Sequence, residues 1–186
     1  MFIETAETPN PATLKFIPGV TVMETGTAEF EDKKSADSSP LATKLFNING
    51  VTRVFYGKDF ISVTKADDYG WAALKTQILA SIMDHFTMGG VLFHPGKAPD
   101  SNDKPSKNLD DEISNQIVEL LETRVRPAVA QDGGDIEFYD YDDGIVYLRM
   151  RGACAGCPSS VLTLKSGIEN MLKHFIPEVQ EVRSIE

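Results

Sequence analysis

Apolar side chains in the first half of the chain recur in the pattern of a small layer of strands and helices. Thr13–Ile17 alternates as a strand does, and the Pro and Gly residues around it predict turns. Residues 31–39 are charged, contain serine and predict a loop. A helix then begins with Pro40 at its first position, and two β-type runs, 51–56 and 60–64, flank a turn and predict a hairpin.

A longer helix is predicted after this hairpin, because large apolar residues recur there at helical spacing. They share one face of the helix: Trp71, Leu74, Ile78, Ile82 and Phe86. Gly89 and Gly90 follow and close this part of the chain. Residues 1–90 are therefore predicted to form one domain, a ββαββα sandwich.

The composition changes after residue 90. Residues 91–108 contain mostly Pro, Gly, Lys, Asp, Ser and Asn, which is typical of a flexible linker. Residues 109–186 then form a second predicted domain. The sequence therefore predicts an α+β protein with two small domains that are joined by this linker.

The second domain has its own apolar pattern. A helix begins after Asp110, whose carboxylate can cap the free N–H groups, and Pro127 lies near the end of that helix. Two strands, 136–141 and 145–150, are joined by an Asp-Gly hairpin signal. A second helix and a last short strand over residues 178–185 complete the predicted order, αββαβ.

The charge and the apolar runs restrict the partners of the chain. The formal net charge is −10 for 186 residues, and no basic block is present. Binding to nucleic acid or to an anionic membrane is not expected, because both depend on basic residues that neutralise phosphate. No apolar run is long enough to cross a bilayer, and the residues after Met1 do not have the composition of a signal or transit peptide. A cytoplasmic protein is expected.

The only two cysteines, Cys154 and Cys157, are the strongest chemical signal in the chain. Their Cys-x-x-Cys spacing allows both sulfur atoms to bind one metal ion or each other. A strand is predicted before them and a helix from Pro158 after them, and the N-terminal end of a helix favours a thiolate over a thiol. In a reducing compartment, such a pair is more often metal-binding or redox-active than structural.

Two thiolates are only half of the four-cysteine set that a tetrahedral metal or an iron–sulfur cluster takes. Three histidines are present, but none has a ligand spacing to another or to Cys157, and they are interpreted as surface or partly buried residues. They are His85, His94 and His174. A two-fold homodimer would bring Cys154 and Cys157 of each copy to one axis and complete the site.

The residues leave three kinds of site open: zinc, an iron–sulfur cluster, and thiol–disulfide exchange. Zinc and clusters both accept four cysteines, but a cluster shared by two subunits can be lost when they part, which suits a carrier. Gly152 and Gly156 allow close approach of the backbone to cluster sulfides. Arg149 and Arg151 either offset the charge of a thiolate-bound cluster or are solvated strand residues. Thiol–disulfide exchange is disfavoured, because no proline lies between the cysteines and no early βαβ unit precedes them.

Two further motifs have two interpretations each. Asp132-Gly133-Gly134-Asp135 is either an acidic metal-binding loop or a tight turn that needs glycine at positive φ, and the turn is preferred. Four aromatic residues of the first domain could form a docking surface for partners, but a small layer of this kind usually buries such side chains in its core. They are Phe55, Tyr56, Phe60 and Trp71.

Longer stretches around these motifs resemble a known protein family. Residues 126–135, 152–160 and 163–169 resemble the NifU C-terminal-like domain of Nfu iron–sulfur carriers. Stretches of the first domain resemble the Nfu N-terminal domain, namely residues 8–11, 14–16, 39–42, 45–46 and 54–61. The resemblance covers both domains in the order that the family has.

This resemblance implies a non-enzymatic carrier. Such a protein holds a [4Fe–4S] cluster between the two subunits of a homodimer, receives it from an upstream cluster scaffold and delivers it to recipient apo iron–sulfur proteins. The residues carried over from the family are Cys154 and Cys157, as ligands of the iron. The implied location is the cytoplasm of a bacterium, or the mitochondrial matrix if the chain is a trimmed organelle protein.

Overall fold

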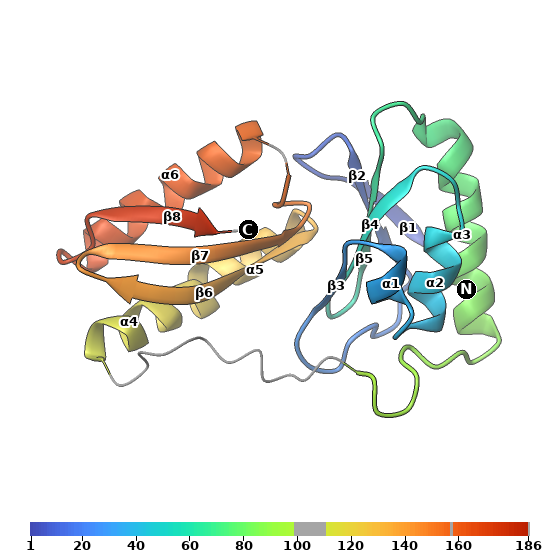
Figure 1. Cartoon of the computed structure of the whole chain (residues 1–186), viewed down its shortest axis with the longest axis horizontal. Coiled ribbons are helices and arrows are strands. Elements are labelled where there is room, and N and C mark those ends of the chain that lie inside the picture. Colours follow the sequence, from blue (N-terminus) through green and yellow to red (C-terminus); the bar gives the residue numbers. More distant parts are fainter. Residues whose placement is uncertain (99–110, 157, 186) are drawn as a thin grey trace. The chain divides into compact units, whose positions relative to one another are not determined.

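The computed structural model describes residues 1–98, 111–156 and 158–185, without the side chains of residues 158–160. The chain divides into two compact units, Met1–Asn102 and Asp103–Glu186. Each unit combines one β-sheet with helices (Figure 1). The predicted α+β class with two small domains is therefore confirmed.

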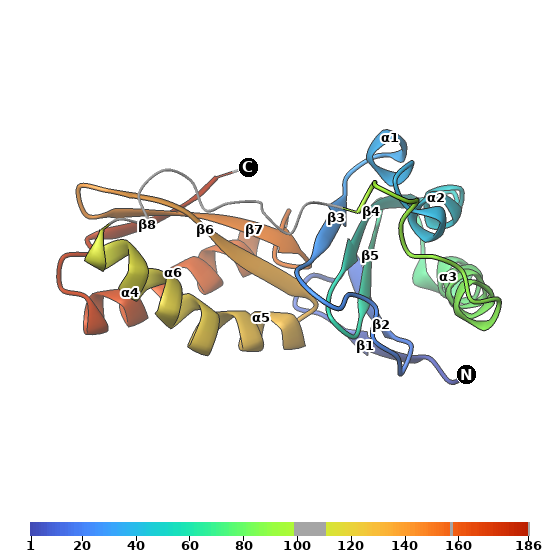
Figure 2. The ribbon, with the colours of Figure 1, turned by 90° about the horizontal axis from the view of Figure 1, so that it is seen from below.

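The first unit is built on a five-stranded antiparallel sheet with the order β1-β2-β5-β4-β3. Its strands are β1 (Glu4–Glu7), β2 (Thr13–Ile17), β3 (Ala28–Phe30), β4 (Val51–Tyr56) and β5 (Ile61–Lys65). Its helices are α1 (Lys33–Ala36), α2 (Pro40–Phe46) and α3 (Trp71–Thr87). Both α2 and α3 lie on the same side of the sheet (Figure 2).

One apolar core fills the space between this sheet and its helices, because each helix directs its apolar face inward. The longer helix, α3, buries Leu74, Ile78 and Ile82, as their spacing in the sequence predicts. The shorter helix, α2, buries Leu41 and Leu45 against the same core. The predicted helices and hairpin of the first domain are therefore present.

The predicted order ββαββα lacks two elements of the first unit, whose observed order is βββααββα. The additional strand β3 pairs with the edge of β4, where the ring of Phe30 packs edge-on against Tyr56 with centroids 5.0 Å apart. The additional helix α1 forms inside the predicted loop, because Asp32 and Ser35 cap each other reciprocally. The usual sequence signature of this motif has Glu or Gln in place of Ser35, so the pattern did not predict it.

The aromatic residues of the hairpin are buried, as the core interpretation predicts for Phe55, Tyr56 and Phe60. Tyr56 belongs to the core between the sheet and the helices, whereas Phe55 and Phe60 pack against each other with ring centroids 5.9 Å apart. Trp71 at the start of α3 is partly buried, and its indole Nε1–H donates to the carbonyl oxygen of Pro11 at 3.1 Å.

The first residues of the predicted linker 91–108 pack against the first unit. Leu92 and Phe93 lie against its core, and the ring centroids of Phe93 and Tyr56 are 6.1 Å apart. The N–H group of His94 donates to the carbonyl oxygen of Ser38 at 3.0 Å. A tether beginning at residue 91 is therefore not observed, because burial of these apolar side chains is favourable. Residues 99–108 lie outside the described part of the chain.

Ser39 connects α2 to the core of the first unit. Its hydroxyl oxygen caps the helix by accepting the N–H group of Ala42 at 3.3 Å. The same oxygen lies 2.9 Å from the hydroxyl oxygen of Tyr56, and both side chains are fully buried. Burial raises the pKa of Tyr56 well above its usual range, so the phenol is neutral at physiological pH.

Ser39→Ala is expected to lower the free energy of unfolding of the first unit by about 1–3 kcal/mol, because it removes a helix cap and a hydrogen-bond partner of a buried phenol. Denaturant unfolding followed by the fluorescence of the single tryptophan, Trp71, measures the loss. Ser38→Ala is the matched control, since the Ser38 hydroxyl donates to the Ser35 carbonyl in an exposed hydrogen bond, and it should cost less than about 0.5 kcal/mol. Equal stability of the two variants would contradict this prediction.

The second unit is built on a three-stranded sheet with the order β6-β7-β8. Its elements are α4 (Glu112–Leu120), the π-helical segment η1 (Leu121–Val125), α5 (Arg126–Gln131), β6 (Gly134–Asp142), β7 (Ile145–Gly152), α6 (Pro158–Phe175) and β8 (Glu181–Ile185). The helices cover one face of the sheet (Figure 2). With α4, η1 and α5 taken as one continuous helix, the predicted order αββαβ is confirmed.

The strands of the second unit pair as the predicted connections require. β6 and β7 are antiparallel and joined by a tight turn, in which Asp143 and Gly144 have φ of 45° and 84°. β8 pairs with β7 in parallel, because α6 crosses over the sheet between them. The apolar core of this unit is separate from that of the first unit.

Pro127 lies near the end of the first helix of the second unit, as the sequence predicts, and the helix continues past it to Gln131. A proline inside an α-helix lacks an N–H group and clashes with the carbonyl four residues before it. The wider turn of η1 relieves this clash, since the N–H group of Arg126 bonds to the carbonyl of Leu121, five residues earlier. At the start of the helix, the observed cap is Asp111, whose carboxylate accepts the N–H of Ile113, while the predicted cap Asp110 lies outside the described residues.

Candidate functional site

Cys154 lies in the turn between the end of β7 and the start of α6, as the sequence predicts. The residue is buried, at 7% exposure. The glycines on either side of it, Gly152 and Gly156, have φ of 64° and 79°, a region that side chains with a Cβ atom rarely adopt. Cys157 lies outside the described residues, so the structure places one cysteine of the pair.

The side chain of Cys154 rests on the turn formed by residues 132–135. A Cβ atom on Gly134 would lie 2.5 Å from the Cys154 sulfur and 2.7 Å from the carbonyl oxygen of Arg151. Gly134 is also paired with Gly152 across β6 and β7. Gly134 therefore lies directly beneath the thiol, and we call it the floor of the site. Any larger residue at this position would displace the Cys154 sulfur.

The two glycines of this turn have different roles. Gly133 has φ of 80° and therefore supplies the tight turn that the sequence predicts. Its carbonyl oxygen accepts the N–H group of Ala153 at 3.1 Å, which ties the turn to the cysteine loop. The contact of Gly134 with Cys154 was not predicted. The available signal in the sequence was a second glycine in a turn that needs only one glycine at positive φ.

The electrostatic surroundings of Cys154 differ from the prediction. Burial, followed by the negative charges of Asp132 and Asp135, raises the pKa of the Cys154 thiol to about 12. The prediction that the helix terminus favours a thiolate is therefore wrong for Cys154 in the metal-free chain. A metal ion that binds this sulfur must displace its proton, as thiophilic cations do.

The two arginines before the cysteine loop are engaged with strand β6. Nη2 of Arg151 lies 2.9 Å from a carboxylate oxygen of Glu137. The guanidinium carbon of Arg149 lies 5.6 Å from the centre of the Tyr139 ring. Neither is a freely solvated strand residue, because both side chains pack on neighbours, and a role in offsetting cluster charge stays a prediction.

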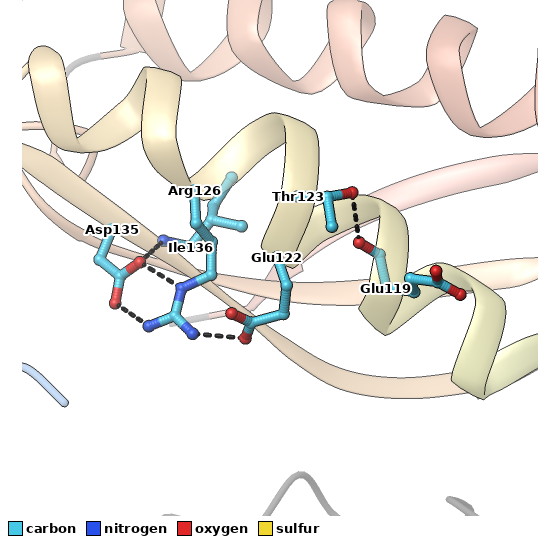
Figure 3. Close-up of polar contacts among 6 residues, drawn as sticks. All are labelled: Glu119, Glu122, Thr123, Arg126, Asp135 and Ile136. Atoms are coloured by element: carbon cyan, nitrogen blue, oxygen red, sulfur yellow. Dashed lines mark hydrogen bonds and ion pairs between the residues drawn. The ribbon is translucent and has the colours of Figure 1, made fainter. Parts of the chain in front are cut away.

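An ion pair anchors the acidic turn to the preceding helix (Figure 3). Nε and Nη2 of Arg126 donate to the two carboxylate oxygens of Asp135, each at 2.9 Å. The same carboxylate accepts the N–H group of Ile136 at 2.8 Å, and Nη1 of Arg126 pairs with Glu122. Hydrogen bonding to Asp135 raises the pKa of Arg126 further above its usual range.

Sequence reasoning assigned no role to Arg126. The available signal was a basic residue, Arg126, nine positions before an acidic residue of a turn, Asp135, and many chains contain such a pattern. The ion pair became visible only when the structure placed the end of the helix beside the start of β6.

The three histidines belong to other parts of the chain than the cysteine loop. His174 is at the C-terminal end of α6, whereas Cys154 precedes the N-terminal end of that helix. His85 and His94 belong to the first unit, where His85 is 3% exposed and therefore buried, not the surface or partly buried residue that the sequence predicts. Within residues 1–98, 111–156 and 158–185, no group of three or more His, Cys, Asp or Glu side chains could hold a metal ion, and no helix is long and apolar enough to span a membrane.

Comparisons with known proteins agree with this architecture. Residues 3–89 match the family described as "Scaffold protein Nfu/NifU N terminal", and residues 117–183 match the family described as "NifU-like domain". NifU-like protein 4, mitochondrial, of Arabidopsis thaliana is 53% identical over 184 residues, which cover 98% of this chain and 65% of that protein. NifU-like protein 5, mitochondrial, of the same plant is 54% identical, with coverage of 98% and 67%.

A human relative extends the similarity over the whole chain. The NFU1 iron-sulfur cluster scaffold homolog, mitochondrial, of Homo sapiens is 49% identical over 186 residues, which cover 100% of this chain and 72% of that protein. The chain spans about two thirds of the length of the two plant relatives. The chain therefore belongs to the Nfu/NifU-like family of scaffold proteins.

Proposed function

We propose that the chain is a non-enzymatic carrier that binds a [4Fe–4S] cluster between two copies of itself and delivers it to recipient apo iron–sulfur proteins. Cys154 and Cys157 of each copy supply the ligands. The observation that carries the proposal is the position of Cys154 on the Gly134 floor, in the turn before α6. The name of the human relative, an iron-sulfur cluster scaffold homolog, supports the same cargo.

The proposal of a homodimer follows from the number of ligands. A cluster of this type takes four cysteine thiolates, and the chain contains two cysteines. Two copies related by a two-fold axis would supply the full set from the same surface on each copy.

The partly sheltered thiol suits a carrier. Burial of Cys154 keeps the free thiol protonated at neutral pH, so the cluster competes with a proton for the sulfur. Recipient thiolates can then take over the iron while Cys154 regains its proton and the two copies separate. The same burial argues against thiol–disulfide exchange started by Cys154, because the attacking species in that reaction is a thiolate.

The proposed carrier function also implies partners and a location for the chain. An upstream scaffold supplies the cluster, and apo-proteins accept it. The relatives from Arabidopsis thaliana and Homo sapiens are named as mitochondrial proteins, which supports the mitochondrial matrix alternative over the cytoplasmic one for this chain.

Anaerobic reconstitution with iron and sulfide is expected to give a brown protein with about four iron atoms per dimer, since that is the content of one cluster with four thiolate ligands. Iron and sulfide analysis, visible absorption and size-exclusion chromatography measure the result. A colourless dimer with one zinc per two chains would contradict the cargo and favour the zinc alternative. A monomer that reduces insulin disulfides would instead favour thiol–disulfide exchange.

A further inference from the structure

Arg126 joins the helix before the acidic turn to the strand after it. It is the first residue of α5, and Asp135 is the second residue of β6. Its guanidinium group holds both oxygens of the Asp135 carboxylate at 2.9 Å, in a fork that fixes their orientation (Figure 3). The residue Asp135 is only 4% exposed, so this ion pair lies largely out of water.

The residues held by this ion pair support Cys154 directly. Gly134, next to Asp135 in the chain, has no room for a Cβ atom beneath the Cys154 sulfur. Gly133 accepts the N–H group of Ala153, the residue before the cysteine. A shift of the Asp135 backbone would therefore move both contacts of the cysteine loop.

We propose that Arg126 is a positioning residue for Cys154, because it locks the Asp135 carboxylate and thereby fixes the glycine turn beneath the thiol. This inference rests on the proposed function, in which Cys154 is a cluster ligand. Without the guanidinium group, the buried carboxylate would lose two charged hydrogen bonds, and the turn would move to bring it closer to water. The Cys154 sulfur, the proposed ligand, would then no longer be held in place by Gly134.

The second arm of the arginine separates positioning from simple charge pairing. Nη1 of Arg126 pairs with Glu122, whose side chain is 52% exposed, and this pair lies four residues apart on the same helix. Exposed pairs of this kind contribute little to stability. Glu122→Gln therefore removes an ion pair of the same arginine without touching the turn, which makes it a matched control.

The test uses the full chain without metal, with Co²⁺ as the probe, and compares wild type with Arg126→Gln, Arg126→Lys and Glu122→Gln. We expect Arg126→Gln to weaken Co²⁺ binding about tenfold, which is the lower end of the loss seen when a residue that orients a metal ligand is removed. The absorption band of a Co²⁺ thiolate measures binding. Arg126→Lys should restore affinity only in part, because an ammonium group cannot hold both carboxylate oxygens. Glu122→Gln should bind as wild type does.

Amide hydrogen exchange provides a second readout that needs no metal. In Arg126→Gln, the N–H of Ala153 should exchange faster relative to the N–H of Val182, which bonds to Glu169 elsewhere in the unit. Val179→Ala is the control for general destabilisation: it removes part of a side chain that is buried in the apolar core of the same unit and should speed both amides together.

The outcomes separate this inference from the proposed function. An unchanged ratio of Ala153 to Val182 exchange in Arg126→Gln would overturn the positioning role, whether or not the chain binds a metal. The opposite result is a changed ratio in Arg126→Gln together with a wild-type chain that takes up neither Co²⁺ nor a cluster. It would support the positioning of Cys154 and overturn the proposed function instead.

Discussion

Cys154→Ala is expected to leave the full chain unable to hold a cluster. Two copies of this variant would retain only the two Cys157 thiolates, half of the set that a [4Fe–4S] cluster takes. After anaerobic reconstitution, bound iron should fall from about four per dimer to near zero. The brown colour and the cluster-dependent dimer should be lost with it, which visible absorption and size-exclusion chromatography measure.

The matched control for this variant is Met150→Leu. Met150 is a buried residue of β7 that also carries sulfur, but a thioether of this kind lacks the thiolate that the cluster needs. Its replacement by leucine conserves volume, so cluster content should stay at the wild-type level. A Cys154→Ala chain that retains the same cluster at wild-type stoichiometry would refute the ligand assignment.

Gly134→Ala is expected to disrupt the site without removing a ligand. The added methyl group would meet the Cys154 sulfur at 2.5 Å and the Arg151 carbonyl oxygen at 2.7 Å, and the second of these atoms is backbone. Overpacking of this kind costs about 1–3 kcal/mol of unfolding free energy. Because relief requires the cysteine loop to move, the variant should also bind cluster poorly, even at temperatures where it remains folded.

The chain offers a matched Gly→Ala control in the same unit. Gly167 lies within α6, and a Cβ atom there would meet nothing within 4 Å. Since alanine favours helix over glycine, Gly167→Ala should raise the free energy of unfolding by up to about 1 kcal/mol and leave cluster binding unchanged. Denaturant unfolding and iron content measure both variants. Wild-type stability and cluster content in Gly134→Ala would contradict the floor role of Gly134.

Elements with a strong periodic pattern were predictable from the sequence. The stripe of α3, the Asp-Gly hairpin between β6 and β7, and the cysteine turn before α6 all lie where the spacing places them. In each case the local signal agrees with the tertiary environment, so one pattern was sufficient.

Features that depend on contacts between distant residues were not predictable. Strand β3 has only three residues and forms because Phe30 meets Tyr56, which is far away in the sequence. The position of Pro127 near the end of its helix was predicted, but the π-helical segment η1 that precedes it was not, because no local pattern indicates it. In both places tertiary packing overrides the local propensity.

The candidate site shows the same division. The cysteine pair and the Gly133 turn were evident from residue types and spacing. The Gly134 floor, the pairing of Arg126 with Asp135 and the protonated state of Cys154 were not, because each depends on which atoms lie within a few ångströms in the folded chain. A helix terminus favours a thiolate, but burial and two nearby carboxylates outweigh it here.

The parallel pairing of β7 with β8 also sets an order for synthesis. β7 and the cysteine loop leave the ribosome before α6 and β8, yet β7 is the central strand of its sheet and needs β8 on one side. The N–H of Val182 in β8 also bonds to Glu169 of α6, which fixes the helix that follows the cysteines. A nascent chain that ends before β8 lacks both the parallel partner of β7 and the bond from Val182 to α6. The second unit can therefore complete its sheet only after its last strand has been made, late in translation.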